Sequence, residues 1–297
     1  MKSKKHTGKV LDKKDGFSVI ECVLCGFKHI LPIPSDTELQ KLYQKEFYQK
    51  EKPNYFKETK EDLPWWLATY ANYYSLLEKH TSGRKILDIG SGPGHFLFTG
   101  KKRGWDVLGV EPSLSASAYA LRRGLPVIND FFSFENLKKY GPFDVVHMSL
   151  VLEHVPEPIQ FLKEAKKLLK PGGLIAVFCP NDYNPLQIIL RNELGFKPWW
   201  VLPRHHLNYF DFKSMKKLLV RLGFKEKECL GTFPLEFFLL SGSNYIGYPS
   251  IGREYHNKRK KFEMSLYKNN TILLNSIYQT LAKYDIGRQF FIIAKNG

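Results

Sequence analysis

Lys85-Ile86-Leu87-Asp88-Ile89-Gly90-Ser91-Gly92-Pro93-Gly94-His95-Phe96 joins an apolar strand to a glycine-rich turn and to the start of a helix. Glycine allows positive φ and lets a ligand approach the backbone closely, while the first turn of a helix offers unpaired N–H groups. Such a turn after a buried strand is typical of a nucleotide-cofactor site. We therefore expect a cofactor to bind where this strand ends.

A second apolar run, Val107-Leu108-Gly109-Val110-Glu111, ends in a carboxylate about twenty residues further on, where an acid can accept hydrogen bonds from ribose hydroxyls. The turn is G-x-G-x-G, however, and not the G-x-G-x-x-G of dinucleotide sites. Asp88, at the end of the first strand, would also repel a pyrophosphate. The pattern therefore favours a cationic ligand over a dinucleotide.

Together these motifs resemble those of class I S-adenosylmethionine-dependent methyltransferases. The resemblance extends through Asn129-Asp130-Phe131, Phe143-Asp144-Val145-Val146, Leu152-Glu153-His154-Val155 and Leu168-Leu169-Lys170-Pro171-Gly172-Gly173, over residues 80 to 232. It implies S-adenosylmethionine as cofactor. The residues it implies for the cofactor site are Asp88, Gly90, Gly92, Gly94, Glu111, Pro112, Asp130, Phe131 and Ser149.

Strands and helices alternate along this region. We expect strands at 85–90, 106–111, 143–149 and 173–179, and helices at 94–103, 114–123 and 158–169, the last ended by Pro171-Gly172-Gly173. Such alternation predicts a parallel sheet with helices on both faces. We also expect Asp211 to cap a further helix, and a strand at Glu226 to Phe233. The fold class is α/β, a Rossmann-like, mostly parallel sheet that the resemblance extends to seven strands, with antiparallel Gln289–Ala294 as the last.

Five segments follow from this reading. They are a knuckle-like module over 1–35, a helical lid or linker over 36–80, the cofactor-binding core over 81–233, a helical segment over 234–287, and the final strand over 288–297. The segment 36–80 is aromatic, with Leu42, Tyr43, Phe47 and Tyr48 before Pro53 and with Trp65-Trp66 after Pro64, and either covers the cofactor or packs on the core. Residues 234–287 either cap the substrate pocket or pack on the sheet edge.

Near the N-terminus, Cys22-Val23-Leu24-Cys25 places two thiols across a tight turn, and His29 follows four residues later. This spacing suits a tetrahedral zinc ion, for which His6 supplies a fourth ligand if the intervening segment forms a hairpin. Methyltransferases of sugar and natural-product pathways carry similar modules, which usually contain four cysteines. Zinc, reduced structural thiols and a redox pair remain three interpretations of the cysteines.

Methyl transfer to a protonated nucleophile needs alignment, exclusion of water and a base. His154, which follows the strand ending at Ser149, and the loop pair His205-His206 are the candidates; we take His154 and His205 as the predicted catalytic residues. Some related enzymes hold a divalent metal with Glu-x-x-Glu-His at this place. Leu150 stands at the first glutamate position, which argues against a metal-assisted mechanism.

The chain has 297 residues and a formal net charge of +16. Its four cysteines do not form a secreted disulfide pattern, and no apolar run reaches membrane-spanning length, so we expect a cytoplasmic protein without membrane insertion. The primary hypothesis is methylation of a small molecule such as a nucleotide-linked sugar or glycan precursor. Because cationic charge attracts nucleic acid, an RNA or tRNA methyltransferase is the second hypothesis. A non-catalytic cofactor-binding scaffold is the third.

Overall fold

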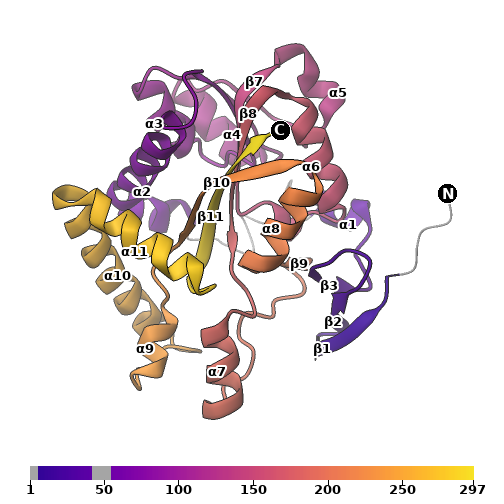
Figure 1. Cartoon of the computed structure of the whole chain (residues 1–297), viewed down its shortest axis with the longest axis vertical. Helices are drawn as coiled ribbons and strands as arrows, with labels where there is room; N and C mark the ends of the chain where they lie inside the picture. The colour runs from indigo at the N-terminus through magenta and orange to yellow at the C-terminus, as the bar shows by residue number, and fades with distance from the viewer. Residues whose placement is uncertain (1–5, 42–54) are drawn as a thin grey trace.

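The computed structural model describes residues 6–41 and 55–297. At its centre lies a sheet with the strand order β10-β11-β8-β7-β4-β5-β6 (Figure 1). In this described sheet β11 runs opposite to the other six strands, which are parallel to one another. The predicted seven-stranded, mostly parallel arrangement is confirmed. The strands are β4 (Lys85–Ile89), β5 (Asp106–Val110), β6 (Val127–Ile128), β7 (Phe143–Ser149), β8 (Leu169–Pro180), β10 (Phe224–Gly231) and β11 (Gln289–Asn296).

Helices cover both faces of the sheet, as predicted (Figure 1). One face packs against α2 (Tyr55–Glu78), α3 (His95–Lys102), α4 (Leu114–Arg122) and α11 (Thr271–Lys283). The other face packs against α5 (Phe134–Leu137), α6 (Pro158–Lys167) and α8 (Phe212–Arg221). The expected cap of α8 is present, because the Asp211 carboxylate accepts the Ser214 N–H at 2.7 Å.

The helix expected over 158–169 ends earlier than predicted. α6 stops at Lys167, and β8 begins at Leu169. Leu169 pairs with Phe143, and the register shifts before Leu174 pairs with Val145. The Pro171-Gly172-Gly173 segment, predicted to end the helix, therefore lies inside strand β8, at the point where the register shifts. Gly172 adopts φ 71° there.

The N-terminal module is built from β1 (Gly8–Lys14), β2 (Phe17–Cys22) and β3 (Lys28–Leu31), and the expected hairpin is formed by β1 and β2. A two-residue strand of the core, β9 (Asn208–Tyr209), completes this sheet by pairing with β3. The module is therefore joined to the core through main-chain hydrogen bonds.

The lid segment begins with α1 (Asp36–Lys41) and continues with α2. Leu39 on α1 and Thr59, Trp66 and Tyr70 on α2 line the cavity described below. The aromatic positions Tyr43, Phe47 and Tyr48, together with Leu42 and Pro53, lie outside the described residues.

The C-terminal segment 234–287 contains α9 (Glu236–Leu240), α10 (Pro249–Asn269) and α11. Leu274 and Tyr278 of α11 pack on the sheet beside Phe291. α10 packs on α2, where Arg253 forms an ion pair with Asp62 at 2.9 Å. None of these described residues lines the cavity, whereas α11 packs on the sheet, and a capping role of the segment stays a prediction. Of the helices over 6–41 and 55–297, none combines the length and apolarity needed to cross a bilayer.

Candidate active site

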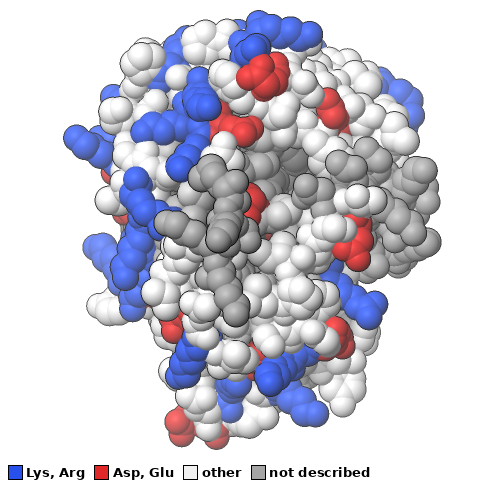
Figure 2. Space-filling model, turned by 90° about the vertical axis from the view of Figure 1, so that its right-hand side faces the viewer, with Lys and Arg blue, Asp and Glu red and all other residues white. Residues whose placement is uncertain are grey.

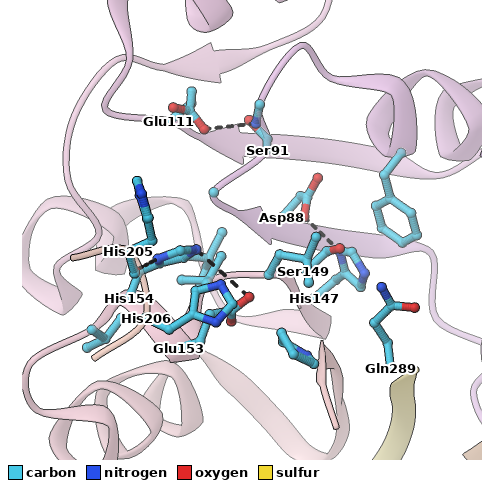
Figure 3. A pocket seen from close by; sticks show the side chains of 18 of the residues that line it. Asp88, Ser91, Glu111, His147, Ser149, Glu153, His154, His205, His206 and Gln289 are labelled. Atoms are coloured by element: carbon cyan, nitrogen blue, oxygen red, sulfur yellow. Dashed lines mark hydrogen bonds and ion pairs between the residues drawn. The ribbon is translucent and has the colours of Figure 1, made fainter. Parts of the chain in front are cut away.

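A cavity of about 1060 Å³ opens at the carboxyl ends of β4, β5 and β7. This is the edge at which parallel α/β sheets bind ligands. One part is lined by the glycine turn and the end of β5, and the other by η3 (Leu152–His154), α7 (Pro185–Leu194) and the loop before β9. Figure 3 shows side chains of both parts around one space. The cavity can therefore hold two reactants side by side.

The glycine turn follows β4 as predicted. Gly90 adopts φ 70°, and its N–H donates to the carbonyl of Val110 at 2.8 Å. A side chain at Gly90 would meet Val151, because an added Cβ would lie 2.6 Å from the valine Cγ2. Glycine at this position therefore allows Val151 to pack against the turn.

Glu111 lies directly after β5 and is buried. Its Oε2 accepts the Gly92 N–H at 2.8 Å, and its Oε1 accepts the Ser113 N–H at 2.9 Å. These bonds fix the carboxylate against the glycine turn. Each oxygen keeps a further lone pair for a hydroxyl donor.

Burial raises the pKa of Glu111 to about 7, although the two backbone N–H groups oppose this shift. The carboxyl therefore titrates near neutral pH. Any ligand that donates hydrogen bonds to it favours the ionised form.

Asp88, predicted as a cofactor-binding residue, is buried at the cavity wall, and its carboxylate is paired with a histidine side chain. His147 Nδ1 lies 2.7 Å from Asp88 Oδ1, because the two residues pair in register on the parallel strands β4 and β7. The ring of His147 also stacks on Phe96, with centroids 3.7 Å apart. Asp88 is therefore positioned by His147, a partner that the sequence analysis did not identify.

Most of the other predicted cofactor residues line the cavity: Gly92, Pro112, Phe131 and Ser149. Two do not. A Cβ at Gly94 would lie 2.6 Å from Leu125, so this glycine permits close packing of α3. Asp130 accepts hydrogen bonds from the Phe131 N–H at 2.8 Å and from Asn136 at 2.7 Å, so it shapes the loop and does not face the cavity.

The second part of the cavity brings three chemically active side chains together. Ligating atoms of Glu153, His154 and His206 all lie within 4.8 Å of one another (Figure 3). His154 Nδ1 lies 2.5 Å from the main-chain carbonyl of His205, which fixes the imidazole, and His154 Nε2 lies 3.8 Å from Glu153 Oε1. Both predicted catalytic residues line the cavity, but the structure places the side chain of His206, and not that of His205, in this cluster.

Glu153 is completely buried, and burial raises its pKa to about 7. Asp182, which follows β8, lies near the same cluster, with Oδ2 3.8 Å from His206 Nδ1. Leu150 lines the cavity in a left-handed backbone conformation, φ 55°, that non-glycine residues rarely adopt. The strained loop carries the cluster into the cavity.

The rest of the second part is aromatic and polar. Trp199 and Trp200 come from the loop after α7, and Asp182, Gln187 and Gln289 add polar groups. None of these residues was predicted from the sequence. The one available signal was the Trp199-Trp200 pair, because tryptophan is enriched at binding sites and binding residues often lie on loops.

At the N-terminal module, the structure brings the four predicted ligands together. Ligating atoms of His6, Cys22, Cys25 and His29 lie within 4.8 Å of one another. Cys22 and Cys25 are unpaired thiols, so the two cysteines do not form a disulfide here.

The cavity fits the predicted cofactor. Gly90 and Gly92 of the glycine turn line the cavity, and the Glu111 carboxylate is held where it can accept hydroxyl donors. Asp88 and Glu111 both contribute carboxylates to the wall, and this donor set suits a cationic sulfonium better than a phosphate. The side chains thus support the S-adenosylmethionine site.

Comparisons with known sequences also find methyltransferases. The chain is 40% identical over 108 residues to a ubiquinone biosynthesis O-methyltransferase of Idiomarina loihiensis, covering 33% of this chain and 44% of that protein. It is 31% identical over 166 residues to one of Caulobacter sp., covering 54% of this chain and 66% of that protein. The chain thus spans between two fifths and two thirds of the length of these relatives.

Solved structures agree on the fold. The plantazolicin methyltransferase BpumL, in complex with a triazolic desmethylPZN analog and SAH, superimposes with a TM-score of 0.53 at 15% identity, covering 87% of this chain and 96% of that chain. A second BpumL structure, in complex with SAH, gives 0.51 at 17% identity and covers 88% and 94%. The sequence model described as a methyltransferase domain matches residues 55–227, more than half of the chain. The protein therefore belongs to this family of S-adenosylmethionine-dependent methyltransferase domains.

Proposed function

We propose that the protein transfers a methyl group from S-adenosylmethionine to a hydroxyl group of a small ring compound. The observation that carries the proposal is the continuity of one cavity from Glu111 to the Glu153, His154 and His206 cluster. The curated relatives named above are O-methyltransferases, which supports oxygen as the acceptor atom.

The lining supports a small, uncharged acceptor. Trp66, Trp199 and Trp200 offer apolar ring faces, and Asp182, Gln187 and Gln289 offer hydrogen-bonding groups. Arg288 is the one lysine or arginine among the described residues that line the cavity. A sugar ring of a glycan precursor fits this lining, whereas the diphosphate of a nucleotide-linked sugar would meet few cations.

RNA is a weaker candidate. On the face shown in Figure 2, which is hollowed near its centre, the lysines and arginines of the described residues gather mainly away from the hollow. Nucleic-acid binding needs cations along the path of the backbone. The described part of this face therefore does not offer such a path.

The cofactor supplies an electrophilic methyl group on a sulfonium. The C–S bond breaks as the new C–O bond forms, and the hydroxyl proton must leave. We infer that His154 takes this proton. Its Nδ1 donates to the His205 carbonyl, so Nε2 carries the lone pair, and the Glu153 carboxylate 3.8 Å from Nε2 would stabilise the imidazolium.

The proposal is tested by incubating the protein with methyl-labelled S-adenosylmethionine and a panel of glycosides, sugar nucleotides, phenols and tRNA. We expect label in hydroxylated small molecules. Labelling of tRNA alone would reject the proposal.

Cofactor affinity should depend on pH through Glu111. Ribose hydroxyls that donate to the carboxylate lower its pKa in the complex, so binding requires the loss of a proton below pH 7 and affinity rises with pH. We expect the Kd of S-adenosylmethionine to increase about fivefold from pH 7 to pH 6 and to be nearly constant above pH 8. Calorimetric titrations at each pH measure this. A Kd that is flat between pH 6 and 8 would contradict the role of Glu111.

Methyl transfer should not need a divalent ion. Leu150 removes one carboxylate ligand from the cluster, and His154 is already placed to act as base. We expect turnover without any added divalent ion to stay within about twofold of turnover with added Mg²⁺, because the proton transfer uses protein groups. If turnover is lost and Mg²⁺ restores it, Glu153, His154 and His206 instead hold a metal.

A further inference from the structure

We propose that a zinc ion held by His6, Cys22, Cys25 and His29 fixes the active-site loop by locking β3 against β9. The zinc site would thus connect the N-terminal module to the histidine cluster, which consists of Glu153, His154 and His206. Metal content and loop order can both be measured without an assay of methyl transfer.

The ligand set is arranged as a zinc site requires. His6 Nδ1 lies 3.6 Å from Cys22 Sγ and 3.3 Å from Cys25 Sγ, and the rings of His6 and His29 meet edge to face with centroids 4.8 Å apart. Two sulfur and two imidazole ligands, all within 4.8 Å, match a tetrahedral structural site.

The surroundings of His29 give an independent indication. Its Nδ1 lies 2.9 Å from the Ile30 carbonyl, and this bond places the proton on Nδ1 and the lone pair on Nε2. Nε2 is buried and has no hydrogen-bond partner within the described part of the chain. A buried acceptor without a partner is costly, and a metal ion in the cluster satisfies it.

The turn between the cysteines is also formed. The Gly26 N–H donates to the Cys22 carbonyl at 2.9 Å, and Gly26 adopts φ 79°. Cys22 and Cys25 are both buried, at 2% and 7% exposure, so their thiols point into the module and not into solvent. The site therefore lies inside the small sheet and bridges its hairpin to β3.

β3 connects the proposed zinc ligands to the active-site loop through main-chain hydrogen bonds. His29 is the register partner of Asn208 on β9, and the Ile30 N–H donates to the Leu207 carbonyl at 2.9 Å. Phe27, between Cys25 and His29, packs on Phe210 with centroids 4.9 Å apart. A zinc ligand and the strand after the histidine loop are thus direct neighbours.

β9 in turn holds η3, which carries Glu153 and His154. The amide of Asn208 donates to the Leu152 carbonyl at 2.9 Å and to the Val155 carbonyl at 2.7 Å, on either side of these two residues. The Leu207 N–H donates to the Glu153 carbonyl at 2.7 Å. Loss of the metal would therefore release β3, and with it the strand that positions the histidine cluster.

The first test is the metal content of the purified full chain, measured by mass spectrometry. We expect about one zinc ion per chain, and loss of the zinc in the double variant Cys22→Ser/Cys25→Ser. Two matched control variants should keep the zinc. Cys229→Ser should keep it because Cys229 lies on β10, outside the cluster. Retention of zinc in His154→Ala would show that the ion is not bound by Glu153, His154 and His206. A chain without zinc, or a double variant that keeps it, would overturn the site.

The second test is hydrogen–deuterium exchange of the same proteins. Loss of zinc should speed exchange in residues 202–209 and 152–155 by about tenfold or more, while α3 and the Kd of S-adenosylmethionine stay within about threefold. The unchanged Kd shows that the core is folded. If the double variant does not fold, removal of zinc from the wild-type chain with a chelator gives the same comparison. Unchanged exchange in 202–209 after loss of zinc would overturn the positioning role.

Discussion

Replacing Glu111 with alanine is expected to weaken S-adenosylmethionine binding by about 100-fold, because a carboxylate hydrogen-bonded to ligand contributes about 1.5–3 kcal/mol. The variant also leaves the N–H groups of Gly92 and Ser113 without their acceptor, so the glycine turn loses its anchor. Isothermal titration of the wild-type and variant proteins measures the difference in Kd.

Glu135→Gln is the matched control for this experiment. Glu135 is also an acid near the start of a helix, but its side chain is 71% exposed and pairs only with Lys138 among the contacts described. Its replacement should leave the Kd unchanged. Equal affinity of the Glu111→Ala variant and the wild-type protein would show that the carboxylate does not contact the cofactor.

Replacing His154 with alanine is expected to lower kcat by about 10²- to 10⁴-fold, the usual contribution of a positioned base. Binding of S-adenosylmethionine should change little, because Glu111 and the glycine turn lie in the other part of the cavity. Steady-state kinetics on an acceptor found in the panel, together with calorimetry, separates the two effects.

His205→Ala is the comparison variant. His205 holds His154 through its main-chain carbonyl, which alanine retains, so we expect a fall in kcat of less than about tenfold. A larger loss for His205→Ala than for His154→Ala would move the base to His205, the other residue that the sequence predicted.

Much of the core could be predicted because it depends on local pattern. The alternation of strands and helices, the glycine turn after β4 and the carboxylate after β5 are each encoded in a few consecutive residues. The cap at Asp211 is local in the same way. The four proposed zinc ligands could be grouped because Cys22, Cys25 and His29 are close in sequence, and a hairpin returns the chain to His6.

The remaining features depend on contacts between distant segments. β9 has only two residues and pairs with a strand about 180 positions earlier, a distance at which local patterns carry no signal. The Asp88–His147 pair follows from the parallel register of β4 and β7. The choice of His206 over His205 depends on the course of a loop, and Gly94 faces Leu125 because of helix packing.

A crystal structure of the protein with S-adenosylhomocysteine tests the central claim most directly. We expect the ribose hydroxyls within hydrogen-bond distance of the Glu111 carboxylate, and the sulfur turned toward the cluster of Glu153, His154 and His206. A ligand bound outside this cavity, or one whose sulfur faces away from the cluster, would contradict the account.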